Sequence, residues 1–206
     1  MAGDPGRHEQ VLAERGARKG LGAYYTPPDV VDGLLRLVLD PLLAERSDQG
    51  VDAVAALRVL DPACGTGNFL VAAAKRIAAT LVGLGVDPVE AAGQGVRCVR
   101  GIEIDAAAVR HCRGNLKAIH PDGGGRTIVR GDALLDDGLV PGGAVDLVVG
   151  NPPFLNQLAA STSRSREDAE RLRARFGPAV GPTRIRRACS CCSRSSWSVR
   201  SAASSR

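Results

Sequence analysis

Four short apolar runs of the sequence each end in polar residues that could bind a ligand. These endings are Asp61 with the glycine-containing turn at 61–67, Glu103, Asp132, and the segment Asn151-Pro152-Pro153-Phe154. In open α/β sheets, ligands bind beyond the carboxyl ends of the strands. One acid after one strand is common, but four polar endings in succession predict a site at one edge of a sheet.

The turn Asp61-Pro62-Ala63-Cys64-Gly65-Thr66-Gly67 would let the backbone approach a ligand closely, because Gly65 and Gly67 lack a Cβ atom. The segment is not a dinucleotide fingerprint, since Phe69 and Leu70 stand where the third glycine is needed. It is not a Walker loop either, because no Gly-Lys-Ser/Thr follows. A tight strand-to-helix turn without a ligand remains the alternative.

Glu103 follows the second apolar run and suits a ribose, because one carboxylate accepts hydrogen bonds from two vicinal hydroxyls. The alternative is local: Glu103 or Asp105 could simply cap a helix over residues 106–118.

The segment Asn151-Pro152-Pro153-Phe154 is the most informative of the four. Its two prolines fix the backbone and remove two N–H donors. The Asn151 side chain and the Pro152 carbonyl are then rigid acceptors for an exocyclic amino group, beside an aromatic ring on which a planar base could stack. The alternative is a structural turn with Phe154 in the core.

The elements that must position these residues alternate along the chain. Strands are predicted at 57–61, 97–105, 126–132 and 144–154, and helices at 69–84, 88–96 and 106–119. A further helix should start at Pro27 or Pro28, bury one face, and end or kink at Pro41. The residues expected on that buried face are Val30, Val31, Leu34, Leu35 and Val38. This alternation predicts a parallel, doubly wound α/β sheet.

Composition sets the class of protein. The 206 residues are 44% apolar and 24% charged, which fits one globular domain, or one domain with a tail. No apolar run approaches the roughly 18 residues of a membrane span, and residues 1–10 contain no secretory apolar segment. We therefore expect a cytoplasmic location and free thiols at the six cysteines. The net charge of +5 belongs to residues 181–206, which hold arginines and no acid, so the body gives no electrostatic indication of nucleic-acid binding.

Taken together, the motifs resemble those of S-adenosylmethionine-dependent DNA adenine-N6 methyltransferases of restriction–modification systems. They are GAYYTP, LDPACGTGNFL, GIEID, GDAL and NPPF, in that family's order, and they span residues 22–154. The resemblance implies a Rossmann-like methyltransferase fold, S-adenosylmethionine as cofactor, no metal, and a DNA adenine flipped out of the duplex as substrate.

The resemblance also implies a role for each motif residue. Tyr25 and Thr26 would flank the methionine end of the cofactor. Asp61, Pro62, Ala63 and the backbone at Gly65 and Gly67 would hold that end, Glu103 would bind the ribose, Ile104 would pack on the cofactor's adenine, and Asp132 would accept from its amino group. The catalytic segment would be Asn151, Pro152, Pro153 and Phe154, with Phe154 stacked on the target base.

The chain departs from this family after residue 154. Such folds have seven strands and only four are predicted here, so we expect an N-terminal extension at 1–20, a partial domain at 21–178 and a disordered Arg/Ser/Cys-rich tail at 179–206. A frameshift near residues 181–183 would produce such a tail. The alternatives are a basic arm for phosphates and, more weakly, a metal site at Cys189, Cys191 and Cys192.

Three further readings of the function stay open at this point. NPP motifs also serve RNA and protein-glutamine methyltransferases, although the YYTPP segment favours DNA. The chain could also be a non-catalytic remnant that binds only the cofactor. Expected partners are DNA and either a specificity or restriction subunit or the missing C-terminal half, with no membrane.

Overall fold

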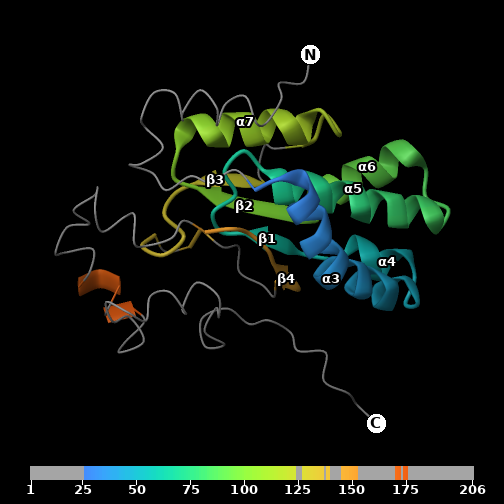
Figure 1. The fold of residues 1–206 in the computed structure, drawn as a ribbon. Coiled ribbons are helices and arrows are strands. Elements are labelled where there is room, and N and C mark those ends of the chain that lie inside the picture. Colours follow the sequence, from blue (N-terminus) through green and yellow to red (C-terminus); the bar gives the residue numbers. More distant parts are fainter. Residues whose placement is uncertain are drawn as a thin grey trace, which may run out of the picture.

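The computed structural model describes residues 26–123, 127–136, 138–139, 145–152, 170–172 and 174–175. Its helices are α3 (Pro28–Ser47), α4 (Val51–Ala55), α5 (Asn68–Gly83), α6 (Pro88–Arg97) and α7 (Ala106–Lys117), and its strands are β1 (Val59–Asp61), β2 (Val99–Glu103), β3 (Ile128–Arg130) and β4 (Leu147–Val148). Figure 1 shows the helices packed around a central sheet. The predicted alternation is confirmed. The expectations for Tyr25, Pro153, Phe154 and the segments 1–20 and 179–206 lie outside the described residues.

The four strands form one parallel sheet in the order β3-β2-β1-β4. The chain passes from β1 to β2 and β3 in one direction, and then returns to place β4 on the other side of β1. The strand order therefore reverses between β1 and β4, which is the point where open α/β sheets bind their ligands. The fold is an α/β Rossmann-like sheet with four strands in the described part of the chain.

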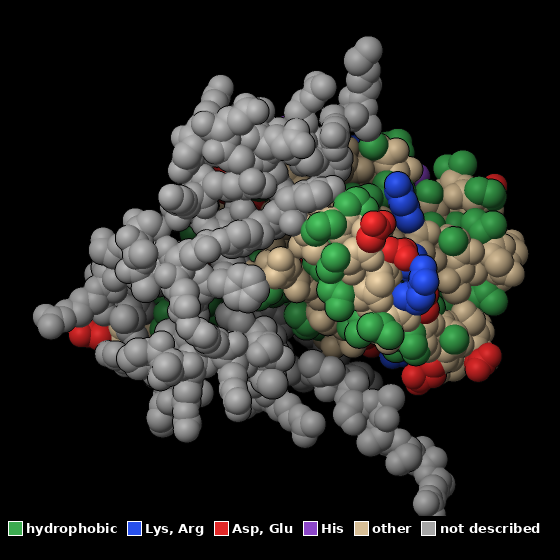
Figure 2. Space-filling model, viewed as in Figure 1, with side chains coloured by type: hydrophobic (Ala, Val, Ile, Leu, Met, Phe, Trp, Pro, Cys, Tyr) green, Lys and Arg blue, Asp and Glu red, His purple; other side chains and the backbone are tan. Residues whose placement is uncertain are grey.

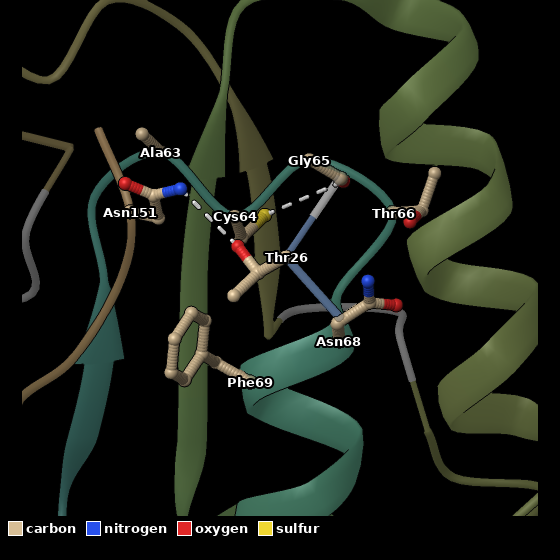
Figure 3. Close-up of a pocket in the computed structure, with 8 residues that line it drawn as sticks. All are labelled: Thr26, Ala63, Cys64, Gly65, Thr66, Asn68, Phe69 and Asn151. Atoms are coloured by element: carbon tan, nitrogen blue, oxygen red, sulfur yellow. Dashed lines mark hydrogen bonds between the residues drawn. The ribbon is translucent and has the colours of Figure 1, made fainter. Parts of the chain in front are cut away.

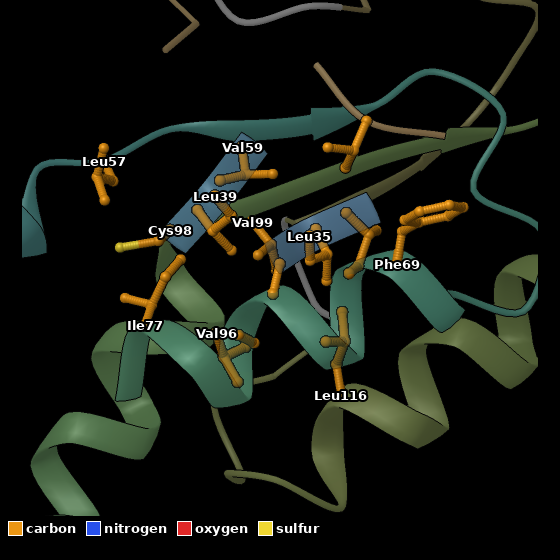
Figure 4. Close-up of a cluster of buried hydrophobic side chains, with 14 of the residues drawn as sticks. Leu35, Leu39, Leu57, Val59, Phe69, Ile77, Val96, Cys98, Val99 and Leu116 are labelled. Atoms are coloured by element: carbon orange, nitrogen blue, oxygen red, sulfur yellow. The ribbon is translucent and has the colours of Figure 1, made fainter. Parts of the chain in front are cut away.

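One aliphatic core joins the helices to the sheet. Val59 and Val99 point from β1 and β2 into a cluster that includes the inner residues of α3, α5 and α7 (Figure 4). Ile128 of β3 belongs to the same cluster. The alternation along the strands places Leu60 and Ile102 on the opposite face, and both are also buried. Strands β1 and β2 therefore carry buried apolar side chains on both faces, as is usual in parallel sheets.

Helix α3 begins as predicted, with Pro28 in its first turn and Asp29 beside it, but its packing differs from the prediction. Its buried stripe is Val31, Leu35, Leu39 and Leu43, whereas Val30, Leu34 and Val38 are exposed. The helix has apolar residues on two adjacent stripes, and periodicity alone does not show which stripe packs against α5.

Pro41 neither ends nor visibly interrupts α3, which continues to Ser47. Proline removes the N–H that would bond the carbonyl of Leu37. Leu37 is 74% exposed and Pro41 is also exposed, so water can satisfy that carbonyl and the helix continues.

Strand β4 contains only two residues, and Asp146 fixes its start. The Asp146 carboxylate accepts a hydrogen bond from the Arg58 backbone N–H at 2.9 Å and forms an ion pair with Arg46 of α3 at 3.0 Å. Val149 then donates to the Leu60 carbonyl at 2.9 Å, which extends the pairing toward the site. Within the described residues, no helix is both long and apolar enough to cross a membrane.

Candidate active site

The loop that follows β1 is shaped by two glycines and by bonds to its neighbours. Gly65 and Gly67 have φ angles of +53° and +90°, a region that side chains with a Cβ rarely adopt. A Cβ on Gly67 would also overlap the Cys112 sulfur of α7. The Cys64 N–H donates to the Ile102 carbonyl at 3.0 Å, and the Gly67 N–H donates to the Cys64 carbonyl at 2.8 Å. The loop therefore ends in a sharp turn that leads into the N-terminus of α5.

Glu103, at the end of β2, holds this loop with its carboxylate. One oxygen accepts from the Gly65 N–H at 2.8 Å, and the other accepts from the Asp105 N–H at 2.9 Å. A carboxylate oxygen can accept more than one hydrogen bond, so Glu103 retains capacity for ligand hydroxyls. Asp105 caps α7 through the Ala107 N–H at 2.7 Å, so the helix-capping alternative holds for Asp105.

The segment after β4 lies against the loop after β1. Gly150 is the contact point, because a Cβ placed on it would lie 2.5 Å from the Asp61 Oδ1 atom. Asn151 follows, and its amide Nδ2 donates to the Thr26 hydroxyl at 3.3 Å. Thr26 precedes α3 and is only 9% exposed. Three segments far apart in the sequence thus meet at one edge of the sheet.

These segments enclose a small cavity of about 30 Å³ (Figure 3). Four of its lining residues, Thr26, Ala63, Gly65 and Asn151, are predicted site residues. The other four lining residues, for which no role was predicted, are Cys64, Thr66, Asn68 and Phe69. The first turn of α5 begins at this cavity and carries no acidic residue of its own, and the positive end of the helix dipole lies beside the cavity.

Asp61 lies beneath the loop and is not among the residues that line the cavity. It is 1% exposed, and its Oδ1 accepts from the Ala63 N–H at 3.0 Å. Burial raises the pKa of this carboxyl to about 7, the Ala63 hydrogen bond opposes the rise, and the negative charge of Glu103 adds to it. The Asp61 carboxyl therefore bonds the start of the loop and lies against Gly150.

Cys64 of this loop packs against Cys112 of α7, and both are buried free thiols. A hydrogen bond to the Cys112 thiol, together with burial, raises the pKa of Cys64. Cys64 is therefore a packed thiol rather than a reactive thiolate. Within the described ranges, no three His, Cys, Asp or Glu side chains are grouped so that they could hold a metal ion.

The remaining predicted residues lie along the neighbouring strand ends. Gly131 donates to the Glu103 carbonyl at 3.0 Å, which brings the end of β3 beside the end of β2. Ile104 is 54% exposed, as a surface for a planar ring would be. The Asp132 Oδ1 accepts from the Leu134 and Leu135 N–H groups at 2.9 and 3.3 Å, so part of its acceptor capacity serves its own turn. Pro62 and Pro152 are half-buried at the ends of β1 and β4.

Asn115 is a residue that sequence reasoning missed. Its amide Nδ2 donates from α7 to the Thr66 carbonyl at 3.0 Å, so it holds the loop from the side opposite β1. An asparagine inside a predicted helix gives no signal by itself. The available clue was its position three residues after Cys112, next to the apolar stripe of that helix.

Comparison with known proteins gives a family match over most of the chain. The model of the family N-6 DNA Methylase matches residues 8–186. The type II methyltransferase M.BstVI of Geobacillus stearothermophilus is 33% identical over 147 residues, which cover 66% of this chain and 25% of that protein. A protein of Methanocaldococcus jannaschii, named as a type II restriction enzyme and methyltransferase, is 28% identical over 101 residues, or 32% of this chain and 8% of that protein.

The chain therefore spans a quarter or less of the length of these relatives. No solved structure matches it.

Proposed function

Because the chain belongs to the N-6 DNA methylase family, we propose that it supplies the methyl-transfer site of a DNA adenine methyltransferase. The reaction would move a methyl group from S-adenosylmethionine to the exocyclic amino group of an adenine in DNA. The observation that supports this most directly is the meeting of Asn151 with the loop after β1, in one small cavity.

The acceptors at Asn151 and Pro152 suit an aromatic amine. The nitrogen of such an amine is a poor nucleophile, because its lone pair is delocalised into the ring. Two acceptors that bind its two hydrogens draw the nitrogen toward tetrahedral geometry and localise the lone pair. The acceptors are preorganised here by the Asn151–Thr26 hydrogen bond at 3.3 Å and by the fixed ring of Pro152.

Several features of the site fit S-adenosylmethionine. The cavity of about 30 Å³ has room for no more than a small polar group such as the carboxylate of the methionine end, so the rest of the cofactor would lie along the strand ends outside it. At the cavity, the N-terminus of α5 favours the carboxylate. Glu103 would accept from the ribose hydroxyls beside Gly65, and the exposed Ile104 would pack on the adenine near Asp132. When bound, the cofactor supplies an electrophilic sulfonium methyl, so the protein needs chiefly to position the amine.

Tyr25, Pro153 and Phe154 complete this proposal from outside the described residues. Tyr25 would flank the methionine end beside Thr26. Pro153 would keep the catalytic segment rigid, and Phe154 would stack on the flipped base. DNA is then the macromolecular partner, and a restriction or specificity polypeptide is a proposed second partner, since the M. jannaschii relative is named for both activities.

The proposal is tested by separating cofactor binding from methyl transfer. We expect S-adenosylmethionine binding by calorimetry, and methylation of unmethylated DNA with a radiolabelled cofactor. Asn151→Ala should lower transfer at least 100-fold, because it removes one preorganised acceptor, and should leave cofactor affinity within about threefold. RNA and a glutamine-containing peptide serve as competing acceptors.

Absence of cofactor binding would refute the proposal. Cofactor binding without transfer to any acceptor would limit the role of this chain to cofactor binding. Preferential methylation of RNA or of the peptide would show that this acceptor, and not DNA, is the substrate.

A further inference from the structure

In the loop after β1, the backbone around Thr66 has unusual conformational freedom. Thr66 stands between Gly65 and Gly67, whose φ angles are both positive. Glycine loses more conformational freedom on folding than other residues, so the two peptide units on either side of Thr66, each shared with a glycine, are costly to hold in one orientation. The Gly67 N–H is fixed by the Cys64 carbonyl at 2.8 Å. The carbonyl of the same peptide unit belongs to Thr66, and Asn115 binds it from α7 at 3.0 Å.

We propose that Asn115 is a positioning residue for the cofactor, which keeps the Thr66–Gly67 peptide in its binding orientation by hydrogen bonding the Thr66 carbonyl. This inference rests on the proposed function, because it assigns the role to the loop that would hold the methionine end. Asn115 itself does not line the cavity, so it acts through Thr66, which does.

The direction of the Thr66 carbonyl gives the physical reason. Figure 3 shows Thr66 beside α7, while Thr26 and Asn151 lie on the other side of the cavity. The hydrogen bond to Asn115 therefore turns the Thr66 carbonyl oxygen toward α7 and away from those residues. If this peptide rotated, the oxygen would point into the cavity. Its partial negative charge would then repel the carboxylate of an amino-acid ligand and oppose the helix dipole of α5.

Helix stability does not explain an asparagine at this position. Residue 115 lies inside α7, and asparagine is a poorer helix former than alanine. The Asn115 side chain is half-buried, and its amide bonds outside its own helix. Its neighbour Arg113 gives a matched comparison, because its guanidinium also donates from α7 to a backbone carbonyl, that of Ile128 in β3 at 2.6 Å. Asn115 therefore connects α7 to the loop after β1, and Arg113 connects α7 to the sheet.

The test measures S-adenosylmethionine affinity by calorimetry and unfolding by urea, on the full chain. Asn115→Ala should weaken binding about 3- to 10-fold, the equivalent of one neutral hydrogen bond, and should lower unfolding stability by no more than Arg113→Ala does. Asn115→Asp should weaken binding further, because a carboxylate would face the Thr66 carbonyl. In the absence of cofactor, Asn115→Ala should also speed amide hydrogen exchange at residues 64–67.

Arg113→Ala is the control, and it should lower unfolding stability while leaving cofactor affinity within twofold. The inference is overturned if Asn115→Ala binds as the parent does, or if Arg113→Ala weakens binding equally. Failure of the parent chain to bind S-adenosylmethionine would refute the proposed function and this inference with it, whereas normal binding by Asn115→Ala would refute the inference alone.

Discussion

The buried carboxyl of Asp61 should make the stability of this protein fall as the pH rises. Asp61 is 1% exposed, and burial raises its pKa from 3.8 to about 7 in the folded protein. Between these two values the folded state keeps a proton that the unfolded state has already released. The unfolded state binds fewer protons in that interval, so the free energy of unfolding decreases with increasing pH. The stabilisation is complete below about pH 4 and is lost as the pH passes 7.

The size of this effect follows from the difference in pKa. A shift of about 3 pH units corresponds to about 4 kcal/mol over the whole interval, at 1.36 kcal/mol per unit. Between pH 5 and pH 8, the contribution of Asp61 to this loss should be roughly 2–3 kcal/mol. That loss is a substantial part of the 5–15 kcal/mol typical of a folded domain.

Asp61→Asn isolates this contribution, since the amide has nearly the shape of the carboxyl and does not ionise. Urea unfolding of the parent and of Asp61→Asn should be measured at pH 5, 6, 7 and 8. The difference between them should shift in favour of the variant by roughly 2–3 kcal/mol across the range. Asp48→Asn, at an exposed position, should follow the parent at every pH. A constant difference between the parent and Asp61→Asn would show that Asp61 is not buried and protonated as described here.

A glycine substitution and a thiol-labelling experiment test the packing around the loop after β1. Gly150→Ala would place a Cβ 2.5 Å from Asp61 Oδ1 and should lower the free energy of unfolding in urea by about 1–3 kcal/mol. The control Gly114→Ala, in open space on α7, should be neutral or stabilising. Equal effects of the two substitutions would contradict the close approach of Gly150 to Asp61. Cys64 should resist alkylation by iodoacetamide at pH 8 in the folded protein and react in urea, because its thiol is buried and its pKa is raised. Mass spectrometry of the alkylated peptides measures the extent of labelling. Rapid labelling of Cys64 in the folded protein would contradict this packing.

The order of elements could be predicted from the sequence, because it depends on local patterns. Each of the four predicted strands contains an observed strand, and the helices at 69–84, 88–96 and 106–119 agree with α5, α6 and α7 to within two residues at each end. Turn chemistry also gave the correct place for the end of β1, since the Gly65 and Gly67 positions need backbone angles that other residues avoid.

Packing partners were less predictable, because they depend on contacts between distant segments. The apolar residues of α3 form two stripes, and only the presence of α5 selects Val31 and Leu35 over Val30 and Leu34. An exposed Pro41 is tolerated because water reaches the Leu37 carbonyl, and exposure cannot be known before the helix is placed.

At the candidate site, too, features that depend on local sequence could be predicted, and most contacts between distant segments could not. The sequence predicted that Asn151 and the loop after β1 would meet, and the structure brings them to one cavity. It did not indicate that Asp61 lies under the loop, or that Glu103 binds the Gly65 N–H at 2.8 Å. The hydrogen bond of Asn115 was also hidden, because its acceptor lies 49 residues away and the position of Asn115 beside the apolar stripe of α7 was the only local clue.

Because strand β4 is short, the placement of Asn151 depends on contacts at the start of the strand. Two residues of pairing specify alignment weakly, and a slip of one residue would turn every following side chain to the opposite face. The Asp146 carboxylate opposes this slip, because it accepts a hydrogen bond from the Arg58 backbone and forms an ion pair with Arg46. The face of the sheet on which Asn151 lies thus depends in part on contacts made five residues upstream, away from the cavity that Asn151 lines.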